Sequence, residues 1–300
     1  MNLEAELRKK SEEFWPIIKT GRTHLQDATP VRLGQEFLGF AGQAENSIKR
    51  LRRAQEALAE VALGGTAVGT GVNTHPEFSR RTCERISDVS GVTVRETTNH
   101  FQAQSTLDAL VEASGQLRTV AISLHKIAND IRFIGSGPRA GLGEILLPEV
   151  QPGSSIMPGK INPVICESMI QVCAQVIGND MTITIGGQGG IFELNLMLPL
   201  IAHNLTQSIE ILTTGTNMFT NKLVKDLKAN EEICAAYVEG SLAMCTSLAP
   251  IIGYDRAAEI AHKAYESGKT IREVSLEEKI LTKKELDLLL DPSKMIKPTD

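Results

Sequence analysis

The sequence predicts an all-α protein, a bundle of long helices followed by a small helical domain. Three long segments carry apolar residues at alternating steps of three and four, the spacing of a helix with one buried face. No strand-rich segment is evident. We therefore expect residues 1–249 to form a bundle of nearly parallel helices and residues 250–300 to form a small C-terminal domain.

The three apolar stripes lie in residues 37–62, 110–131 and 205–223. Each has a narrow seam, which favours long helices that pack along one another. The stripes consist of Phe37, Ala41, Ala44, Ile48, Leu51, Leu58 and Ala62, then Leu110, Leu117, Ala121, Leu124, Ala128 and Ile131, then Leu205, Leu212, Phe219 and Leu223.

Residues 164–185 form a fourth helical segment with a different pattern, because most of its faces are apolar. A helix of this kind needs neighbours on all sides. One chain of this length supplies too few of them, so the pattern favours an oligomer whose subunits pool their helices.

Three segments read as loops, namely residues 20–30, 64–78 and 135–160. The last is long and dense in glycine, proline and serine, and a loop of this length in a compact domain is more often a functional lid than a plain connection.

A short helix is expected near the C-terminus, where Thr282 and Glu285 have the spacing of a capping box. Leu281 and Leu286 flank this box and form the matching hydrophobic staple.

The composition excludes several classes of protein. A net charge of −5 argues against a nucleic acid partner, because neutralising phosphates requires clustered lysine and arginine. No apolar run approaches the roughly 18 residues of a membrane span, and the charged N-terminus resembles neither a signal nor a transit peptide. Five irregularly spaced cysteines predict reduced thiols in a cytosol-like compartment. The cysteines and six scattered histidines form no metal or iron–sulfur ligand pattern.

The end of the long loop is the most informative stretch for chemistry. Asn162 followed by Pro163 predicts a helix start with Asn162 as its N-cap. The loop then brings Lys160 and Asn162 to a helix N-terminus, where the dipole and free N–H groups favour an anion. Taken alone, this spacing fits either a carboxylate site or an ordinary helix cap.

Glu167 is expected about one turn into the same helix, where a carboxylate is also ordinary, because acidic residues suit helix N-termini. A functional role for it requires a partner, and His24 in the first loop is the candidate. Without further information, His24 reads as a solvent-exposed loop histidine.

Several motifs together resemble the fumarase/aspartase superfamily, and class II fumarases in particular. GSSIMPGKIN resembles the superfamily signature, with the glycine of MPGK in its fumarase version. KTGRTHLQDATPVRLGQEF resembles the fumarase segment that carries the catalytic histidine. GGTAVGTGVNTHPEF, KIANDIRFIGSGPRAGLGE and TIGGQGGIFELN are also similar to fumarase segments, in the family's order along nearly the whole chain.

The resemblance implies the long-helix bundle of this superfamily and the reversible addition of water to fumarate, giving L-malate through an aci-carboxylate intermediate. It assigns catalytic roles to His24, which handles the water, to Glu167, which polarises His24, and to Ser154, which removes the C3 proton of malate. Substrate-binding roles fall on Thr23, Ser155, Lys160 and Asn162. A helix tip with an ammonium and an amide suits the charge of that intermediate.

The resemblance further implies no metal and no organic cofactor, and a homotetramer in which three subunits build each site. The expected location is cytoplasmic, or the mitochondrial matrix in a eukaryote. The family's N-terminal domain is not recognised in the sequence. We therefore expect a truncated chain, or one half of a split enzyme whose partner chain supplies that domain, with little or no activity alone.

The sequence is also compatible with two other functions. Aspartate ammonia-lyase shares the intermediate and differs in the group added, although GRTHLQDATP, MPGK and TIGGQGGIFELN favour fumarase. A non-catalytic helical scaffold is the second, favoured by the missing domain and disfavoured by the intact site residues. A class I iron–sulfur fumarase is excluded by the lack of a cysteine cluster.

Overall fold

The computed structural model describes residues 1–151, 153 and 156–298. The chain divides into two compact units, and each is described by itself. One, here the bundle unit, comprises residues 1–3, 42–131 and 163–221. The other, here the hairpin unit, comprises residues 4–41, 132–162 and 222–300.

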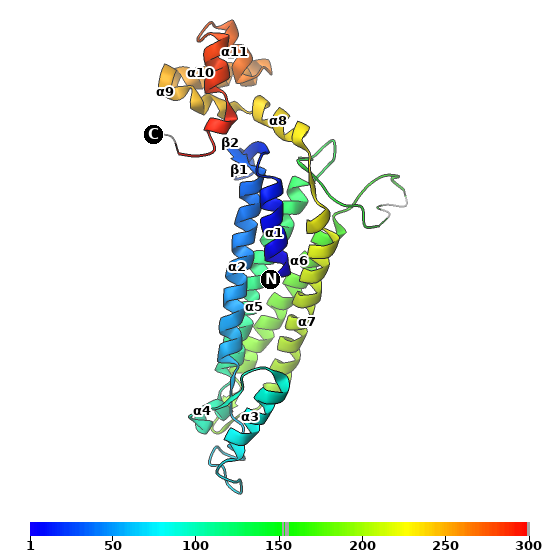
Figure 1. Cartoon of the computed structure of the whole chain (residues 1–300), viewed down its shortest axis with the longest axis vertical. Coiled ribbons are helices and arrows are strands. Elements are labelled where there is room, and N and C mark those ends of the chain that lie inside the picture. The colour runs from blue at the N-terminus through cyan, green and yellow to red at the C-terminus, as the bar shows by residue number, and fades with distance from the viewer. Residues whose placement is uncertain (152, 154–155, 299–300) are drawn as a thin grey trace. The chain divides into compact units, whose positions relative to one another are not determined.

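The bundle unit is built on long helices. They are α2 (Leu33–Ala57, from Gly42 onward), α5 (Asp108–Ile134, up to Ile131), α6 (Val164–Gly187) and α7 (Leu198–Lys222). Figure 1 shows α5, α6 and α7 running along one another, and hydrogen bonds from Ser114 to Asp180 and from Asn179 to Ser208 join them. The second and third apolar stripes are confirmed, because Leu117, Leu124, Leu212 and Phe219 are among the residues buried there.

Shorter elements complete the bundle unit. Helix α3 spans Phe78–Ser90 and α4 spans His100–Ser105. Strands β3 (Glu60–Val61) and β4 (Arg95–Glu96) pair in parallel, and β6 (Gly190–Ile191) pairs antiparallel with β7 (Leu194–Asn195).

The hairpin unit begins with α1 (Asn2–Glu13, from Glu4 onward) and the antiparallel pair β1 (Ile18–Thr23) and β2 (Gln26–Arg32). Strand β5 (Ile145–Leu146) pairs antiparallel with β8 (Lys228–Ala229). The remaining elements are η1 (Val224–Asp226), α8 (Glu231–Gly240), η2 (Leu242–Ser247), α9 (Ala249–Ile252), α10 (Tyr254–Ser267), α11 (Ile271–Glu277), α12 (Lys283–Leu289) and η3 (Pro292–Lys294).

The C-terminal helices pack around a core of their own that includes Leu248, Ile260, Val274 and Leu286. The predicted capping box at α12 is confirmed, since Thr282 and Glu285 exchange both hydrogen bonds and Leu281 packs against the core that contains Leu286. A second capping box, Thr270 with Glu273, opens α11.

The all-α fold class is confirmed, but the predictions of the first loop and of the end of the first apolar stripe are wrong. Residues 20–30 belong mostly to the β1–β2 hairpin, not to a loop. Helix α2 ends at Ala57, so Leu58 and Ala62 are not part of its stripe. The chain leaves the helix there because the backbone of the next residues pairs with β4.

The cysteines are free thiols, as predicted. Cys166 and Cys173 are fully buried in α6, and burial raises the pKa of Cys173 to about 12. Both therefore serve as core side chains. Within the described residues, none of the helices combines the length and apolarity needed to cross a bilayer.

Candidate active site

His24 lies at the tip of the β1–β2 hairpin. Thr23 pairs with Gln26, so His24 and Leu25 form a two-residue turn, with φ angles of 57° and 59°. Positive φ at both central residues is what a type I′ turn requires, although that turn favours Asn-Gly. Non-glycine residues in this region cost on the order of 1–3 kcal/mol each. The hairpin thus holds His24 at an exposed tip in a strained conformation, with Thr23 exposed beside it.

A buried cluster of charges lies at the base of this hairpin. Lys19 Nζ is 2.9 Å from Glu36 Oε1 and 3.2 Å from Glu144 Oε2, and Arg22 Nη1 donates to the same Glu144 oxygen at 2.8 Å. The side chains of Lys19 and Glu144 are 2% and 0% exposed. We call these four residues the buried charge cluster. Its two positive and two negative formal charges cancel. An uncompensated charge would be costly where so little of the side chains reaches solvent.

Burial and the neighbouring cations shift the pKa of Glu36, in the buried charge cluster, in opposite directions. Burial raises the pKa of Glu36, and the nearby Lys19 ammonium opposes that rise. Among the described residues, Glu36 Oε2 and Glu144 Oε1 are buried without a hydrogen-bond partner. All four lie within the motifs that resemble fumarase segments, but no role could be assigned to them from the sequence, because Arg22 and Glu144 are 122 residues apart and only the fold brings them together.

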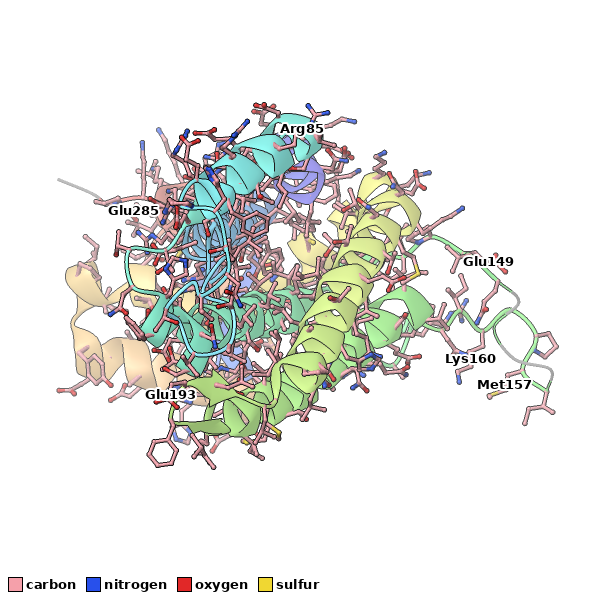
Figure 2. The ribbon with its side chains drawn as sticks, turned by 90° about the horizontal axis from the view of Figure 1, so that it is seen from below. Arg85, Glu149, Met157, Lys160, Glu193 and Glu285 are labelled. Carbon is pink, nitrogen blue, oxygen red and sulfur yellow. The ribbon has the colours of Figure 1, made fainter. Side chains whose placement is uncertain are left out.

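The loop that carries Lys160 is closed at its base by a side chain. Asn162 Nδ2 donates to the Gly153 carbonyl at 3.0 Å, and the Lys160 amide donates to Met157 O at 3.2 Å. Figure 2 shows Glu149, Met157 and Lys160 along this loop, and the Lys160 side chain is exposed. The predicted site residues Ser154 and Ser155 lie outside the described residues.

The prediction that Asn162 caps α6 is wrong. The helix begins at Val164, its N-cap is Pro163, and no side chain makes a capping hydrogen bond. The Asn162 amide instead holds Gly153, which is why the helix starts one residue later. Glu167 lies in the first turn of α6 as predicted, half-buried, and its backbone N–H donates to Pro163 O at 3.0 Å.

The structure brings only part of the predicted site into one unit. Thr23, His24, Lys160 and Asn162 belong to the hairpin unit, and Glu167 belongs to the bundle unit. In the described part of the chain no hydrogen bond or ion pair joins His24 to Lys160 or Asn162.

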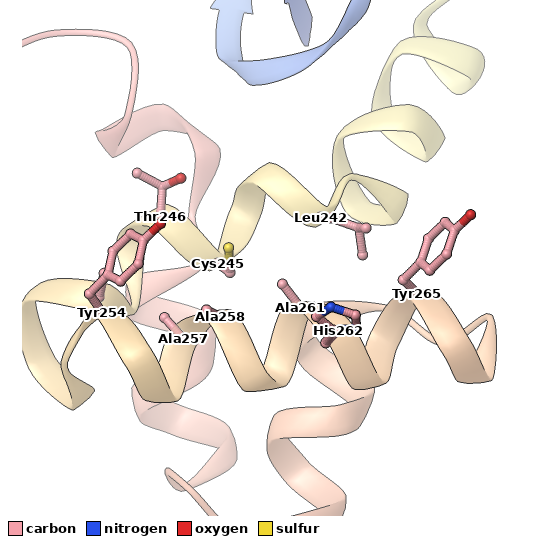
Figure 3. A pocket seen from close by; sticks show the side chains of 10 residues that line it. Leu242, Cys245, Thr246, Tyr254, Ala257, Ala258, Ala261, His262 and Tyr265 are labelled. Carbon is pink, nitrogen blue, oxygen red and sulfur yellow. The ribbon is translucent and has the colours of Figure 1, made fainter.

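Among the described residues, cavities also lie away from these positions. One of about 590 Å³ is formed by η2 and α10, with Tyr254, His262 and Tyr265 in its wall (Figure 3). Another, of about 630 Å³, is lined in part by Arg272 and Asp287, and a third, of about 310 Å³, lies at the glycine-rich segment 64–79. None of these three is lined by a predicted site residue.

Gly153 lies directly against the Lys160 backbone where the loop closes. A Cβ at Gly153 would overlap the Lys160 carbonyl oxygen, so Gly153→Ala must push the two backbone strands of the loop apart. We expect a cost of about 1–3 kcal/mol to the closed loop and faster trypsin cleavage after Lys160. Gly240→Ala is the control, because a Cβ there meets no atom within 4 Å. Equal cleavage rates in the two variants would contradict the closed loop.

Comparisons with known proteins give consistent results. The family described as "Lyase" matches residues 1–178, and the one described as "Fumarase C C-terminus" matches residues 244–297. Class II fumarate hydratase of Neisseria meningitidis is 48% identical over 99% of this chain and 64% of its own length. Mitochondrial fumarate hydratase of Rhizopus oryzae is 49% identical over 99% of this chain and 60% of its own. The chain therefore spans less than two thirds of the length of these relatives.

Solved structures agree with the sequence comparisons. A class II fumarase from Schistosoma mansoni superposes with a TM-score of 0.94 at 37% identity, covering 100% of this chain and 66% of that one. A Brucella melitensis protein described as fumarate lyase:delta crystallin, bound to cobalt, also gives a TM-score of 0.94, at 45% identity, covering 99% of this chain and 64% of that one.

Proposed function

Because the chain belongs to the lyase family that includes the class II fumarate hydratases, we propose that it forms part of a fumarate hydratase active site. The comparisons confirm the resemblance to class II fumarases that the sequence motifs indicate. The observation that carries the proposal is the likeness of nearly the whole chain, at 48% identity, to a protein named class II fumarate hydratase. The named relatives are fumarate hydratases, so this likeness does not favour aspartate ammonia-lyase or a scaffold.

The proposed substrate is the dicarboxylate pair fumarate and L-malate. In the hydration direction the water oxygen bonds to one alkene carbon, His24 takes a proton from that water, and Ser154 gives a proton to the other carbon. In reverse, Ser154 removes the C3 proton, and the C–O bond then breaks as His24 returns its proton to the leaving hydroxide, which departs as water. Lys160 and Asn162 stabilise the aci-carboxylate formed between these steps, because both donate to developing negative charge.

A His–Glu pair suits this scheme, since a carboxylate fixes the imidazole tautomer and raises its basicity. We propose that Glu167 supplies this carboxylate, from a different copy of the chain if the sites are shared between subunits. Thr23 and Ser155 complete the proposed substrate contacts. A cytoplasmic location, or the mitochondrial matrix in a eukaryote, stays a prediction.

A homotetramer is part of the same proposal. Helix α6 exposes Ile177, Met181 and Ile185, which are 41%, 62% and 55% exposed and lie four residues apart along one face. An apolar stripe of this length on a bundle helix is typical of a surface covered by another helix.

We expect a tetramer by light scattering at micromolar concentration, and a smaller species for Met181→Glu, which places a charge in that stripe. Val89→Glu is the control, because Val89 is 72% exposed on α3, outside the stripe. A monomeric wild-type chain would contradict the proposed assembly.

The activity itself is tested by following fumarate absorbance with the purified chain, alone and supplied with the N-terminal domain of a class II fumarate hydratase. We expect little or no turnover alone and fumarate hydration once the domain is supplied. Ser154→Ala in the supplied protein is expected to remove that turnover, and ammonia in place of water as the added group is expected to give no product. Aspartate formation, or turnover unaffected by Ser154→Ala, would overturn the proposal.

A further inference from the structure

We infer that Glu144 is a positioning residue that ties the hairpin presenting His24 to the root of the loop presenting Lys160. The inference rests on the proposed function only for the roles of those two residues. All the contacts that carry it lie within the hairpin unit.

The hairpin is attached to Glu144 through β1. Arg22 lies two residues before His24 and donates to Glu144 Oε2 at 2.8 Å. Lys19, on the same strand, approaches the same oxygen at 3.2 Å and also bonds Glu36 at 2.9 Å. Charge-assisted hydrogen bonds of this length are among the stronger ones in proteins. The strand that leads to the histidine is therefore anchored to one carboxylate.

Both backbone groups of Glu144, its N–H and its carbonyl, are hydrogen-bonded to other segments. Its N–H donates to Ile134 O at 3.0 Å, at the end of α5. Its carbonyl accepts from the Asn230 amide at 2.9 Å and from Cys234 Sγ at 3.6 Å, at the start of α8. The next two residues are β5, paired with β8, and the part of the loop that leads to Lys160 follows directly. Glu144 is thus a fixed point at the root of that loop.

A second path joins the same two segments. The Arg22 guanidinium lies over the Tyr237 ring, 5.7 Å from its centroid. The Tyr237 hydroxyl donates to Gly141 O at 3.2 Å, three residues before Glu144. Arg22 therefore contacts the loop root both directly and through an aromatic side chain on α8. A single stabilising ion pair would need no such second path.

Stability alone does not account for this arrangement. Burying charges is expensive, and replacing a buried ion pair with apolar groups is often neutral or stabilising. The cluster instead fixes the relative position of two segments that each lead to a proposed site residue. Displacing Glu144 is therefore expected to loosen both segments. Losing a contact that only stabilised its own surroundings would loosen one of them.

Hydrogen exchange of the full chain, followed by mass spectrometry, tests this without substrate. We expect Arg22→Gln and Glu144→Gln each to speed exchange about 10- to 100-fold in both residues 18–32 and residues 141–151. The ring resonance of His24, identified by its loss in His24→Asn, is expected to shift in Glu144→Gln.

Arg118→Gln is the matched control. Arg118 Nη1 bonds the buried Asp180 at the same distance of 2.8 Å, but in the bundle unit, so both segments and the His24 resonance should be unchanged. If Arg22→Gln speeds exchange only in residues 18–32 and Glu144→Gln only in residues 141–151, the inference is overturned.

A conservative variant covers the case in which the glutamine variants unfold. Arg22→Lys keeps the charge but loses the planar guanidinium that bonds Glu144 and lies over the Tyr237 ring, and we expect it to fold and to speed exchange less, but still in both segments. Acceleration confined to residues 18–32 would overturn the inference. The exchange experiment measures no activity, so its failure would not affect the proposed function. Conversely, a lack of activity in the chain supplied with the N-terminal domain would not affect the exchange result.

Discussion

Lys19→Met is expected to lower the free energy of unfolding by about 3–5 kcal/mol at neutral pH. The Lys19 side chain is 2% exposed and contacts Glu36 and Glu144, so its loss leaves the fully buried Glu144 and the partly buried Glu36 with Arg22 as their remaining cation. Methionine keeps most of the side-chain volume, so the cost arises from uncompensated charge and not from a cavity.

The same variant should depend on pH in a defined direction. Burial already raises the pKa of Glu36 above its ordinary value of 4.5, and removing the Lys19 ammonium removes the main opposing effect. A carboxyl whose folded pKa is raised binds more protons when folded than when unfolded. Its stability contribution is therefore present below about pH 4.5 and is lost as the pH rises through the folded pKa. The cost of Lys19→Met should accordingly shrink in acid.

Urea unfolding at several pH values and one protein concentration measures both effects. Lys10→Met is the matched control, because the Lys10 side chain is also buried, at 5% exposed, but bonds the Leu227 carbonyl and Glu13, which is 46% exposed. Its removal leaves no buried carboxylate, so we expect a smaller cost without the acid dependence. Equal costs with the same pH profile in both variants would show that the buried charge cluster is not the cause.

The helices and the family were predictable from sequence because their signals are local or lie in contiguous motifs. A 3.6-residue period identifies α5 and α7 whatever surrounds them. The capping box at Thr282 and Glu285 spans only four residues and was predicted correctly. The motif around His24 identified the family, which the comparisons confirm.

The β1–β2 hairpin escaped prediction because its turn lacks the usual signal. A type I′ turn is normally read from Asn-Gly or Asp-Gly, and here the two positions are His24 and Leu25. The strands are polar on much of their length, and Pro30 lowers the expectation of a strand further. What fixes the hairpin is its buried base at Lys19, a tertiary contact with residues far away in sequence.

The buried charge cluster could not be predicted for a related reason. An isolated lysine or glutamate in a sequence is most often on the surface. Lys19 and Glu144 become a buried pair only when the segment after α5 packs against the hairpin. Asn162 illustrates the same limit at shorter range, since a hydrogen bond to Gly153 nine residues away displaced the expected helix cap by one residue.

His24→Asn, in the chain supplied with the N-terminal domain, is expected to lower kcat for fumarate hydration by about 10²–10⁴-fold. Asparagine removes the imidazole that takes a proton from water, yet it is a preferred residue for a type I′ turn at this position. The hairpin should therefore keep its geometry, with unfolding free energy unchanged or slightly higher. A loss of turnover without a loss of stability would separate the chemistry of His24 from its place in the fold.

Leu25→Gly is the control for the same turn. Leu25 has a φ of 59° and is 71% exposed, so glycine relieves backbone strain and removes few contacts. We expect this variant to be at least as stable as wild type and to retain most of its turnover, because the imidazole remains at the hairpin tip. If His24→Asn retains turnover while Leu25→Gly loses it, the hairpin tip matters through its backbone, and the assignment of His24 to proton transfer is wrong.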